Sequence, residues 1–214
     1  MTSKPRLFGA DYSVYVRIAR LALAEKDVGY ELVPVDIFDP AGIPEWYPER
    51  HPFKRIPAFE HGDLRLFETS AICRYVDEAF DGPPLQPGDA AGRATMNQTI
   101  GLLDAYAYRA MVWGVYVERA GKASRGAASD DDVIAASMAV AETCLASLTR
   151  LMGSAPWLAG ERPTLADLHA APIFAYFTQA QEGAALLDAH PPVAAWWDRI
   201  QARSSFEDTR PTAK

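Results

Sequence analysis

The pattern of hydrophobic and polar positions changes character near residue 80 of this 214-residue chain. Before that point, short apolar runs typical of strands, such as "PRLFG" and "GYELVPVDI", alternate with segments whose apolar residues recur at helical spacing. The runs "IPAFE" and "LRLFE" enclose the turn "HGD" and predict an antiparallel hairpin. The order βαβ, an irregular proline-broken segment and then ββα predicts a small α/β domain with a mixed sheet.

The second part of the chain has a helical pattern throughout. Residues 81–92 are dense in proline and glycine and predict a linker. Helical spacing of apolar residues then covers four segments, at residues 93–120, 131–152, 164–180 and 193–203. We therefore expect an α/β domain over residues 1–80 and an all-α domain over residues 93–214.

The tetrapeptide "TLAD" marks the start of one of these helices. Thr164 is a good helix N-cap, and Asp167 stands three residues later, where its carboxylate can reach back to the amide of the cap. The usual residue at the second position is Glu or Gln, so Asp is a shorter substitute. We interpret this pair as a folding element and not as a catalytic one.

Composition and charge exclude several classes of protein. A net charge of -7 argues against a general nucleic-acid binder, which usually carries a basic excess. The first residues lack the apolar run of a signal peptide, and no segment reaches the ~18 to 20 apolar residues of a membrane span. Two distant cysteines, Cys73 and Cys144, fit a reducing compartment, and the histidines lack zinc-ligand spacing. We expect a soluble cytoplasmic protein with no metal.

Three segments, in order along the chain, carry a family resemblance. They are "LFGADYSVYVRIARLALAEK", "HPFKRIPAFEHGDLRLFETSAICRYV" and "WLAGERPTLADLHAAPIF". Together they resemble the cytosolic glutathione transferases, and the serine-type phi-like and bacterial members are closest in motif. The resemblance implies a thioredoxin-like amino-terminal domain that binds glutathione, an all-α carboxyl-terminal domain and a homodimer.

The segment "FETSA" is the expected holder of one end of glutathione. A helix start offers free N–H groups and a partial positive charge, which suit a carboxylate. The resemblance implies that Glu68 and Thr69 hold the γ-glutamyl group, with the Glu68 carboxylate facing the ligand's ammonium group. The alternative is that Thr69 or Ser70 only caps the helix.

The segment "KRIPAF" is expected to hold the rest of the tripeptide. In the family the bond before this proline is cis, so Ile56 and Pro57 would place the cysteinyl backbone as an added strand does. Arg55, with Lys54 beside it, would meet the glycyl carboxylate. The family commonly has a glycine at the Lys54 position, so this residue departs from the pattern. Both cations are otherwise solvated charges, and Pro57 is otherwise an edge-strand proline.

Ser13 is the expected catalytic residue. It matches the family's catalytic serine where the first strand meets the first helix, and its hydroxyl would donate a hydrogen bond to the glutathione thiolate. Val14 follows it where a small residue is usual. Tyr12 is the rival donor, and Ser13 is otherwise a plain helix cap.

The electrophile pocket is expected on the long helix of the second domain. Tyr106, Arg109 and Trp113 fall on one helical face, and we expect them to line the pocket together with Tyr12. The alternative is that these side chains belong to the core or to a dimer contact.

The residues thus predict a glutathione transferase that attacks small hydrophobic electrophiles. One alternative is a glutathione-dependent isomerase, although "ADYSVYV" lacks the Ser-Ser-Cys run of those enzymes. Another is a non-catalytic glutathione-binding scaffold protein of the same fold. The physiological electrophile is not encoded in any motif that we recognise.

Overall fold

The computed structural model describes residues 4–212 of the chain. The chain divides into two compact units. Unit 1 comprises Met1–Leu85 together with Ser204–Lys214, and unit 2 comprises Gln86–Arg203. The carboxyl-terminal segment thus groups with the first unit, whereas chain order led us to expect it in the second. The domain limits drawn from the sequence stay a prediction.

Unit 1 contains a four-stranded mixed sheet with the strand order β2-β1-β3-β4. Strand β1 (Arg6–Phe8) pairs in parallel with β2 (Glu31–Val33) and antiparallel with β3 (Ala58–His61). Strand β3 forms the predicted hairpin with β4 (Leu64–Phe67). The sheet confirms the mixed α/β domain that the sequence predicts.

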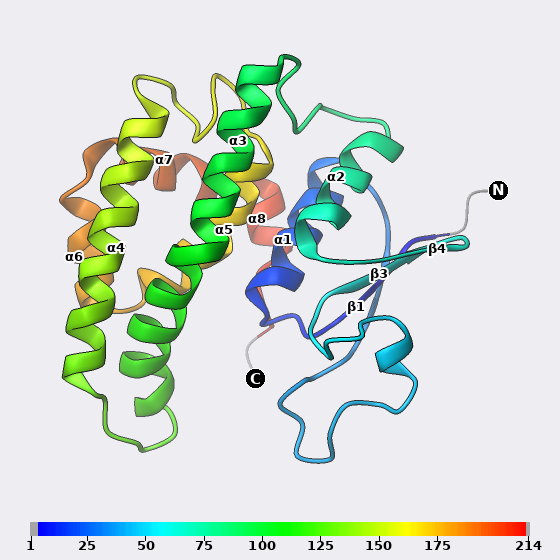
Figure 1. Ribbon diagram of the computed structural model, residues 1–214, viewed down its shortest axis with the longest axis horizontal. Helices are drawn as coiled ribbons and strands as arrows, with labels where there is room; N and C mark the ends of the chain where they lie inside the picture. The colour runs from blue at the N-terminus through cyan, green and yellow to red at the C-terminus, as the bar shows by residue number, and fades with distance from the viewer. Residues whose placement is uncertain (1–3, 213–214) are drawn as a thin grey trace. The chain divides into compact units, whose positions relative to one another are not determined.

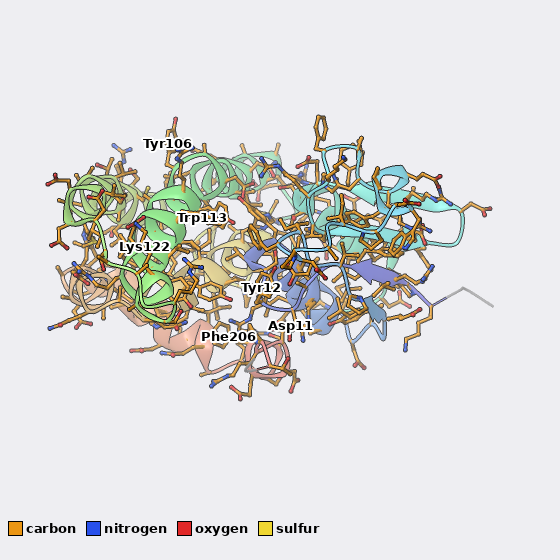
Figure 2. The ribbon with its side chains drawn as sticks, turned by 90° about the horizontal axis from the view of Figure 1, so that it is seen from below. Asp11, Tyr12, Tyr106, Trp113, Lys122 and Phe206 are labelled. Carbon is orange, nitrogen blue, oxygen red and sulfur yellow. The ribbon has the colours of Figure 1, made fainter. Side chains whose placement is uncertain are left out.

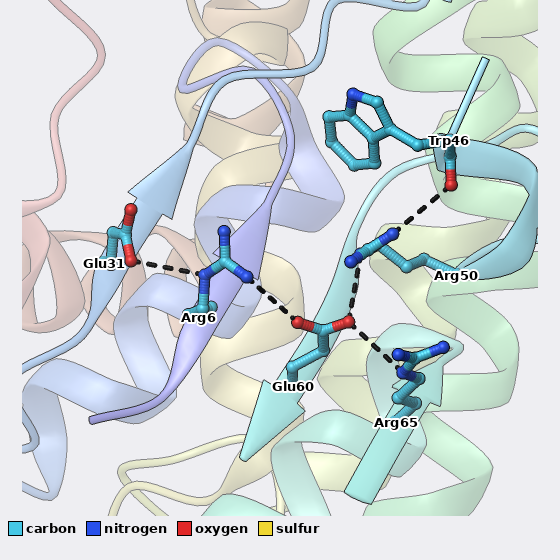
Figure 3. A network of polar contacts seen from close by, with 6 residues as sticks. All are labelled: Arg6, Glu31, Trp46, Arg50, Glu60 and Arg65. Carbon is cyan, nitrogen blue, oxygen red and sulfur yellow. Dashed lines mark hydrogen bonds and ion pairs between the residues drawn. The ribbon is translucent and has the colours of Figure 1, made fainter. Parts of the chain in front are cut away.

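A ladder of alternating charges crosses this sheet (Figure 3). Arg6 is the register partner of Glu31 on one side and of Glu60 on the other, with N–O distances of 3.3 Å to both carboxylates. Glu60 faces Arg65 of β4 at 3.4 Å and also meets Arg50 at 3.0 Å. Opposite charges directly across strands favour this register, because a slip of one residue would separate every pair.

Helices cover the sheet of unit 1 (Figure 1). Helix α1 (Val14–Glu25) packs against α2 (Thr69–Ala79) and against the short α8 (Ser204–Asp208). A single turn of 3-10 helix, η1 (Tyr47–Glu49), occupies the proline-broken segment. The core of the unit is made of side chains from both layers, including Leu7, Phe8, Ile18, Leu21, Phe59 and Ile72, all with no exposed area.

A buried ion pair fixes the end of unit 1. Lys26, the C-cap of α1, places its Nζ 3.2 Å from Asp77 Oδ1 of α2, and the two side chains are 3% and 6% exposed. The same Nζ donates to the carbonyls of Gly82 and Pro83. Asp77 Oδ1 also accepts from the Leu85 amide at 2.8 Å. These bonds hold the first part of the predicted linker against the helices.

Unit 2 is helical, and the part of it that the structure describes has no strand beyond an isolated bridge between Trp157 and Gly160. Its elements are α3 (Ala90–Leu102), η2 (Leu103–Gly121), α4 (Asp131–Met152), α5 (Leu165–Phe177), α6 (Gln181–Asp188) and α7 (Pro191–Gln201). Helices η2 and α4 approach closely at Gly114, where a Cβ would lie 2.0 Å from Ser137 Oγ. The all-α second domain is therefore confirmed.

The helical pattern expected over residues 93–120 is confirmed. An α-helix to Leu102 is followed directly by a π-helix with i→i+5 hydrogen bonds from Leu103 to Gly121. Met96, Ile100, Leu103 and Ala107, which recur at helical spacing, are all buried. A spacing of threes and fours does not distinguish the two hydrogen-bond patterns, so the sequence did not predict the change at Leu103.

The predicted capping box is confirmed and has a wider role in the core. Asp167 is fully buried, and it accepts hydrogen bonds from the amide of Thr164 at 2.6 Å and from the Thr164 hydroxyl. The Leu158 amide and the Trp196 indole N–H also donate to it, at 2.9 and 2.8 Å. Burial raises the pKa of this carboxyl, and the four donors oppose that effect. Asp167 therefore joins α5 to the preceding loop and, through the buried Trp196, to α7.

Candidate functional site

At the edge of unit 1 where β1 ends, the backbone of Gly9 lies close to the side chains of two other segments. The amide of Gly9 donates to the Val33 carbonyl at 3.0 Å. A Cβ on Gly9 would lie 2.4 Å from Val16 Cγ2 and 3.3 Å from the Cβ of Ile56. Only glycine fits here without displacing its neighbours. This close approach brings the start of α1 next to the segment before β3, so two of the predicted site segments meet.

Ser13 is the N-cap of α1. Its backbone is extended, with φ −68° and ψ 129°, and its Oγ accepts from the amide of Val16 at 3.4 Å. A serine hydroxyl can accept through one lone pair while its proton is donated elsewhere. The cap and the thiolate donor are therefore compatible roles for this half-buried side chain at the positive end of a helix.

The hydroxyl of Tyr12, the rival thiolate donor, is directed to a carboxylate of unit 1. Its Oη donates to Asp36 Oδ1 at 2.5 Å, and its ring stacks on Phe38 with a centroid distance of 6.5 Å. Asp36 Oδ1 also accepts from the amide of Phe38, which fixes the loop after β2. The Tyr12 proton thus serves this loop, which favours Ser13 over Tyr12 as the thiolate partner.

The segment before β3 has the geometry that the resemblance implies. The peptide bond between Ile56 and Pro57 is cis, and both residues are buried. The hydroxyl of Tyr47, a side chain with no exposed area, donates to the carbonyl of Arg55 at 2.7 Å. The loop is thereby held from inside unit 1, while the side chains of Lys54 and Arg55 are exposed.

Lys54 and Glu68 share an unusual backbone conformation. Lys54 has φ 55°, and its amide donates to the His51 carbonyl at 2.9 Å. A positive φ favours glycine, which accounts for the glycine that the family commonly has at this position. Glu68 has φ 71° and ψ 111°, a region that non-glycine residues rarely occupy. Such outliers concentrate at ligand-binding positions, where the surroundings hold them in place.

Glu68 is also the N-cap of α2. Its carbonyl accepts from the amides of Ala71 and Ile72, both at 3.0 Å, but its side chain makes no capping hydrogen bond. Helix α2 begins at Thr69, which is 7% exposed. Neither Thr69 nor Ser70 therefore occupies the cap position that the alternative interpretation gives them. The exposed Glu68 carboxylate stands at the helix start, as a partner for a ligand's ammonium group would.

His51 is a residue of this site that the sequence reasoning missed. It is 3% exposed, and its ring contacts those of Phe53 and Phe67. Burial lowers its pKa, Arg55 lowers it further, and Glu68 raises it. The contact between His51 and Phe67 brings the loop before Arg55 close to the segment that carries Glu68. Its position two residues before Phe53 in a proline-rich loop carries no motif that could have identified it.

The residues expected at the electrophile pocket lie on η2 of unit 2 (Figure 2). Tyr106 is 62% exposed and Trp113 is 43% exposed, and Arg109 is also exposed. Tyr106 lines a largely apolar groove of about 460 Å³ with residues of α3 and α4, and neither Arg109 nor Trp113 is among the lining residues. The lining is Leu102, Tyr106, Ala139, Val140, Thr143, Cys144 and Ser147. The electrophile pocket stays a prediction.

Residues 4–212 contain no group of three or more His, Cys, Asp or Glu side chains placed to hold a metal ion. The chemistry available at the edge of unit 1 comes instead from a serine hydroxyl at a helix start, from exposed charges of both signs and from the backbone beside a cis proline. This set can bind a zwitterionic peptide in extended form and can donate a hydrogen bond to an anion near Ser13.

Comparison with known proteins agrees with this reading. The family model for the glutathione S-transferase N-terminal domain matches residues 7–84, and the model for the C-terminal domain matches residues 108–204. The probable glutathione S-transferase GSTF1 of Oryza sativa subsp. japonica is 30% identical over 94% of this chain and 93% of its own.

Two solved structures are similar along nearly the whole chain. Glutathione S-transferase III in its apo form has a TM-score of 0.86 at 29% identity, covering 97% of this chain and 95% of that one. Glutathione S-transferase I from maize, in complex with an atrazine glutathione conjugate, has a TM-score of 0.83 at 28% identity, covering 97% and 96%. With both domains matched and relatives aligned end to end, the chain belongs to the glutathione S-transferase family.

Proposed function

We propose that this transferase conjugates the thiolate of glutathione to small hydrophobic electrophiles, and that the Ser13 hydroxyl stabilises the thiolate. The observation that carries the proposal is the convergence of three segments at one edge of unit 1. The Ser13 turn lies next to Ile56 at Gly9, and the ring of His51, four residues before Arg55, contacts the ring of Phe67, which precedes Glu68. These segments provide a hydroxyl, a backbone edge and charges of both signs within one site.

Each part of glutathione has a matching group in this arrangement. The γ-glutamyl carboxylate lies at the start of α2 near Thr69, and its ammonium group pairs with Glu68. The cysteinyl backbone extends along Ile56 and Pro57 in the manner of an added strand. The glycyl carboxylate meets Arg55, with Lys54 beside it. The sulfur then faces Ser13.

Ionisation of the thiol explains only a small part of the rate. Lowering a thiol pKa of ~8.5 by about two units raises the thiolate fraction near neutral pH roughly twelvefold. Intrinsic nucleophilicity falls about eightfold over the same change, with a Brønsted slope of ~0.45. The two effects nearly cancel, so most of the rate comes from holding the electrophile beside the sulfur.

Unit 2 supplies the electrophile side of the proposal. Tyr106, Arg109 and Trp113 present exposed aromatic and cationic surface on η2. Exposed aromatic side chains suit a flat apolar substrate. The maize relative was solved with an atrazine glutathione conjugate, which supports an aromatic electrophile here and a role in detoxification.

A homodimer is part of the same proposal. Helix α4 is long and apolar enough to cross a membrane, judged by length and composition only, yet just 28% of its apolar 18-residue stretch is buried inside the protein. Val133 and Val140 on this helix are each 40% exposed, and Val140 lines the groove beside Tyr106. A face of this kind is typical of an interface, and we assign it to a second copy of this chain. Sedimentation of the wild type and of Val140→Glu tests the assignment, which requires the variant to dissociate.

A reducing, cytoplasmic setting agrees with the cysteines. Cys73 and Cys144 are both buried, and burial raises the pKa of the Cys144 thiol to about 11. Neither cysteine occupies the position of Ser13, where a cysteine-type transferase would carry its nucleophile.

The proposal is tested by retention on immobilised glutathione followed by a chlorodinitrobenzene assay. We expect the wild type to bind and to turn over, and Ser13→Ala to bind glutathione but to turn over more slowly, with the largest loss below about pH 6.5, where the thiolate fraction falls most. Ser13→Thr keeps a hydroxyl that can cap and donate, and it serves as the matched control. Retention of the wild type without turnover would instead indicate a non-catalytic scaffold protein.

A further inference from the structure

The last residues of the chain form part of unit 1 through α8. Arg17 of α1 donates from Nη2 to the Phe206 carbonyl at 2.8 Å, and its guanidinium lies 4.2 Å from the centroid of the Phe206 ring. The Ser205 hydroxyl donates to Glu25 near the other end of α1. Ser205, Phe206 and Thr209 are 5%, 6% and 2% exposed, so α8 is packed as a core element although it is short.

Beyond α8 the chain returns to the segment that carries Ser13. The amide of Thr212 donates to Asp11 Oδ2 at 3.0 Å, and the Thr212 hydroxyl donates to the same oxygen. Burial raises the pKa of the Asp11 carboxyl, but these hydrogen bonds and the nearby Arg20 outweigh it and hold that pKa below its usual value. Figure 2 labels Asp11, which precedes α1, and Phe206 of α8, which packs against α1.

Asp11 occupies the turn that ends at Ser13. The Ser13 amide donates to the Ala10 carbonyl at 3.1 Å, so Asp11 and Tyr12 are the two central residues of a β-turn. The side chain of Tyr12 is held by Asp36, and the side chain of Asp11 is held by Thr212. Both central residues of the turn are therefore tied to other parts of unit 1.

We propose that Thr212 is a positioning residue for Ser13, because it fixes the Asp11 turn and so sets the direction of the hydroxyl that meets the glutathione thiolate. The inference rests on the proposed function of Ser13. A serine side chain has three staggered rotamers, and only one of them aims its hydroxyl at a given acceptor. A turn held at both central residues restricts the backbone from which that rotamer projects. Releasing Thr212 removes one of the two restraints.

The two substitutions of Thr212 that test the proposal leave the charge of the protein unchanged. Thr212→Val removes the hydroxyl donor to Asp11, and Thr212→Pro removes the hydroxyl and the amide donor together. The control is Arg210→Gln, which breaks an exposed ion pair with Glu207 in the same segment. Residue 212 is exposed at the end of the chain, so neither substitution disturbs a packed side chain.

The readout is the pKa of the enzyme-bound glutathione thiol, from the pH dependence of thiolate absorbance and of kcat/KM. We expect Thr212→Pro to raise it by about 0.5 to 1 unit, which lowers the thiolate fraction below the pKa about 3- to 10-fold. Thr212→Val is expected to show a smaller rise in the thiol pKa. KM for glutathione should change less than about twofold, because the contacts that bind glutathione equally in the ground state and the transition state are kept. The same thiol pKa in wild type and Thr212→Pro overturns the inference, and so does an equal rise in Arg210→Gln.

Failure of the proposed function has a different signature. In that case the wild type itself binds glutathione without lowering the thiol pKa, or Ser13→Ala has the same bound thiol pKa as the wild type. A Ser13-dependent thiol pKa that is indifferent to Thr212 leaves the proposed function intact and removes only the positioning role.

Discussion

Replacing Lys26 by methionine probes the buried ion pair that closes unit 1. Methionine keeps an unbranched apolar side chain but removes the charge that pairs with Asp77 and the donors to the carbonyls of Gly82 and Pro83. The Asp77 carboxylate, only 6% exposed, then loses its cation and keeps the hydrogen bond from the Leu85 amide. Removing one partner of a buried pair costs about 3 to 5 kcal/mol, and the remaining amide favours the lower end.

A loss of about 3 kcal/mol corresponds to a fall in Tm of roughly 6 to 12 °C for a chain of this size. Differential scanning calorimetry of Lys26→Met measures it. Lys122→Met is the control, because Lys122 pairs with Glu118 at a helix surface where its side chain is 31% exposed, and we expect a change within about 0.5 kcal/mol. Adding Asp77→Asn to Lys26→Met should recover part of the loss, since the uncompensated charge is removed. Equal melting temperatures for Lys26→Met and Lys122→Met would refute the reasoning.

Three further predictions concern unit 1. Glu60→Gln leaves Arg6 and Arg50 without their shared carboxylate, so urea unfolding should show a loss of about 1 to 2 kcal/mol, and no loss would contradict a role for the ladder. The pKa of His51 is lowered by burial, so its contribution to stability is complete above pH ~6.5 and is lost as pH falls toward the folded-state pKa. His51→Gln should therefore flatten the dependence of unfolding free energy on pH below about pH 6.5, and an unchanged slope would exclude this origin. Gly9→Ala forces a Cβ against Val16 and Ile56, so we expect about 1 to 3 kcal/mol of destabilisation and weaker binding of glutathione, both measured by calorimetry. Wild-type stability and affinity would show that Val16 and Ile56 move aside without cost.

Local signals predicted much of this fold. Helix α1 begins directly after Ser13, because Ser13 is a helix cap and the apolar spacing that follows is regular. The hairpin followed from the glycine turn at Gly62, and the Thr164–Asp167 box marked α5. In each case the decisive interaction lies within a few residues along the chain.

The features that were missed depend on partners far away in the sequence. Helix α8 has five residues and is defined by Arg17, whose bond to the Phe206 carbonyl spans 189 positions. The four donors to Asp167 include Trp196, 29 residues away. The π-helix at Leu103–Gly121 depends on which carbonyl each amide selects, and side-chain spacing does not specify that.

Motifs predicted which residues form the candidate site, and the structure adds the backbone conformations and hydrogen bonds of those residues. Residue type alone does not show that Glu68 and Lys54 have positive φ, or that the hydroxyl of Tyr12 is directed to Asp36. His51 had no pattern to mark it, since its importance lies in its burial between two charged loops. Such properties arise only when the segments are brought together.

The most direct test of the account is an ultraviolet titration of the thiol of glutathione bound to the wild type and to Ser13→Ala. The account predicts a bound thiol pKa about two units below the value of ~8.5 for a free thiol in the wild type, and a return of at least about one unit toward that value in Ser13→Ala. Saturation with glutathione in both proteins, with the same thiol pKa in each, would contradict it.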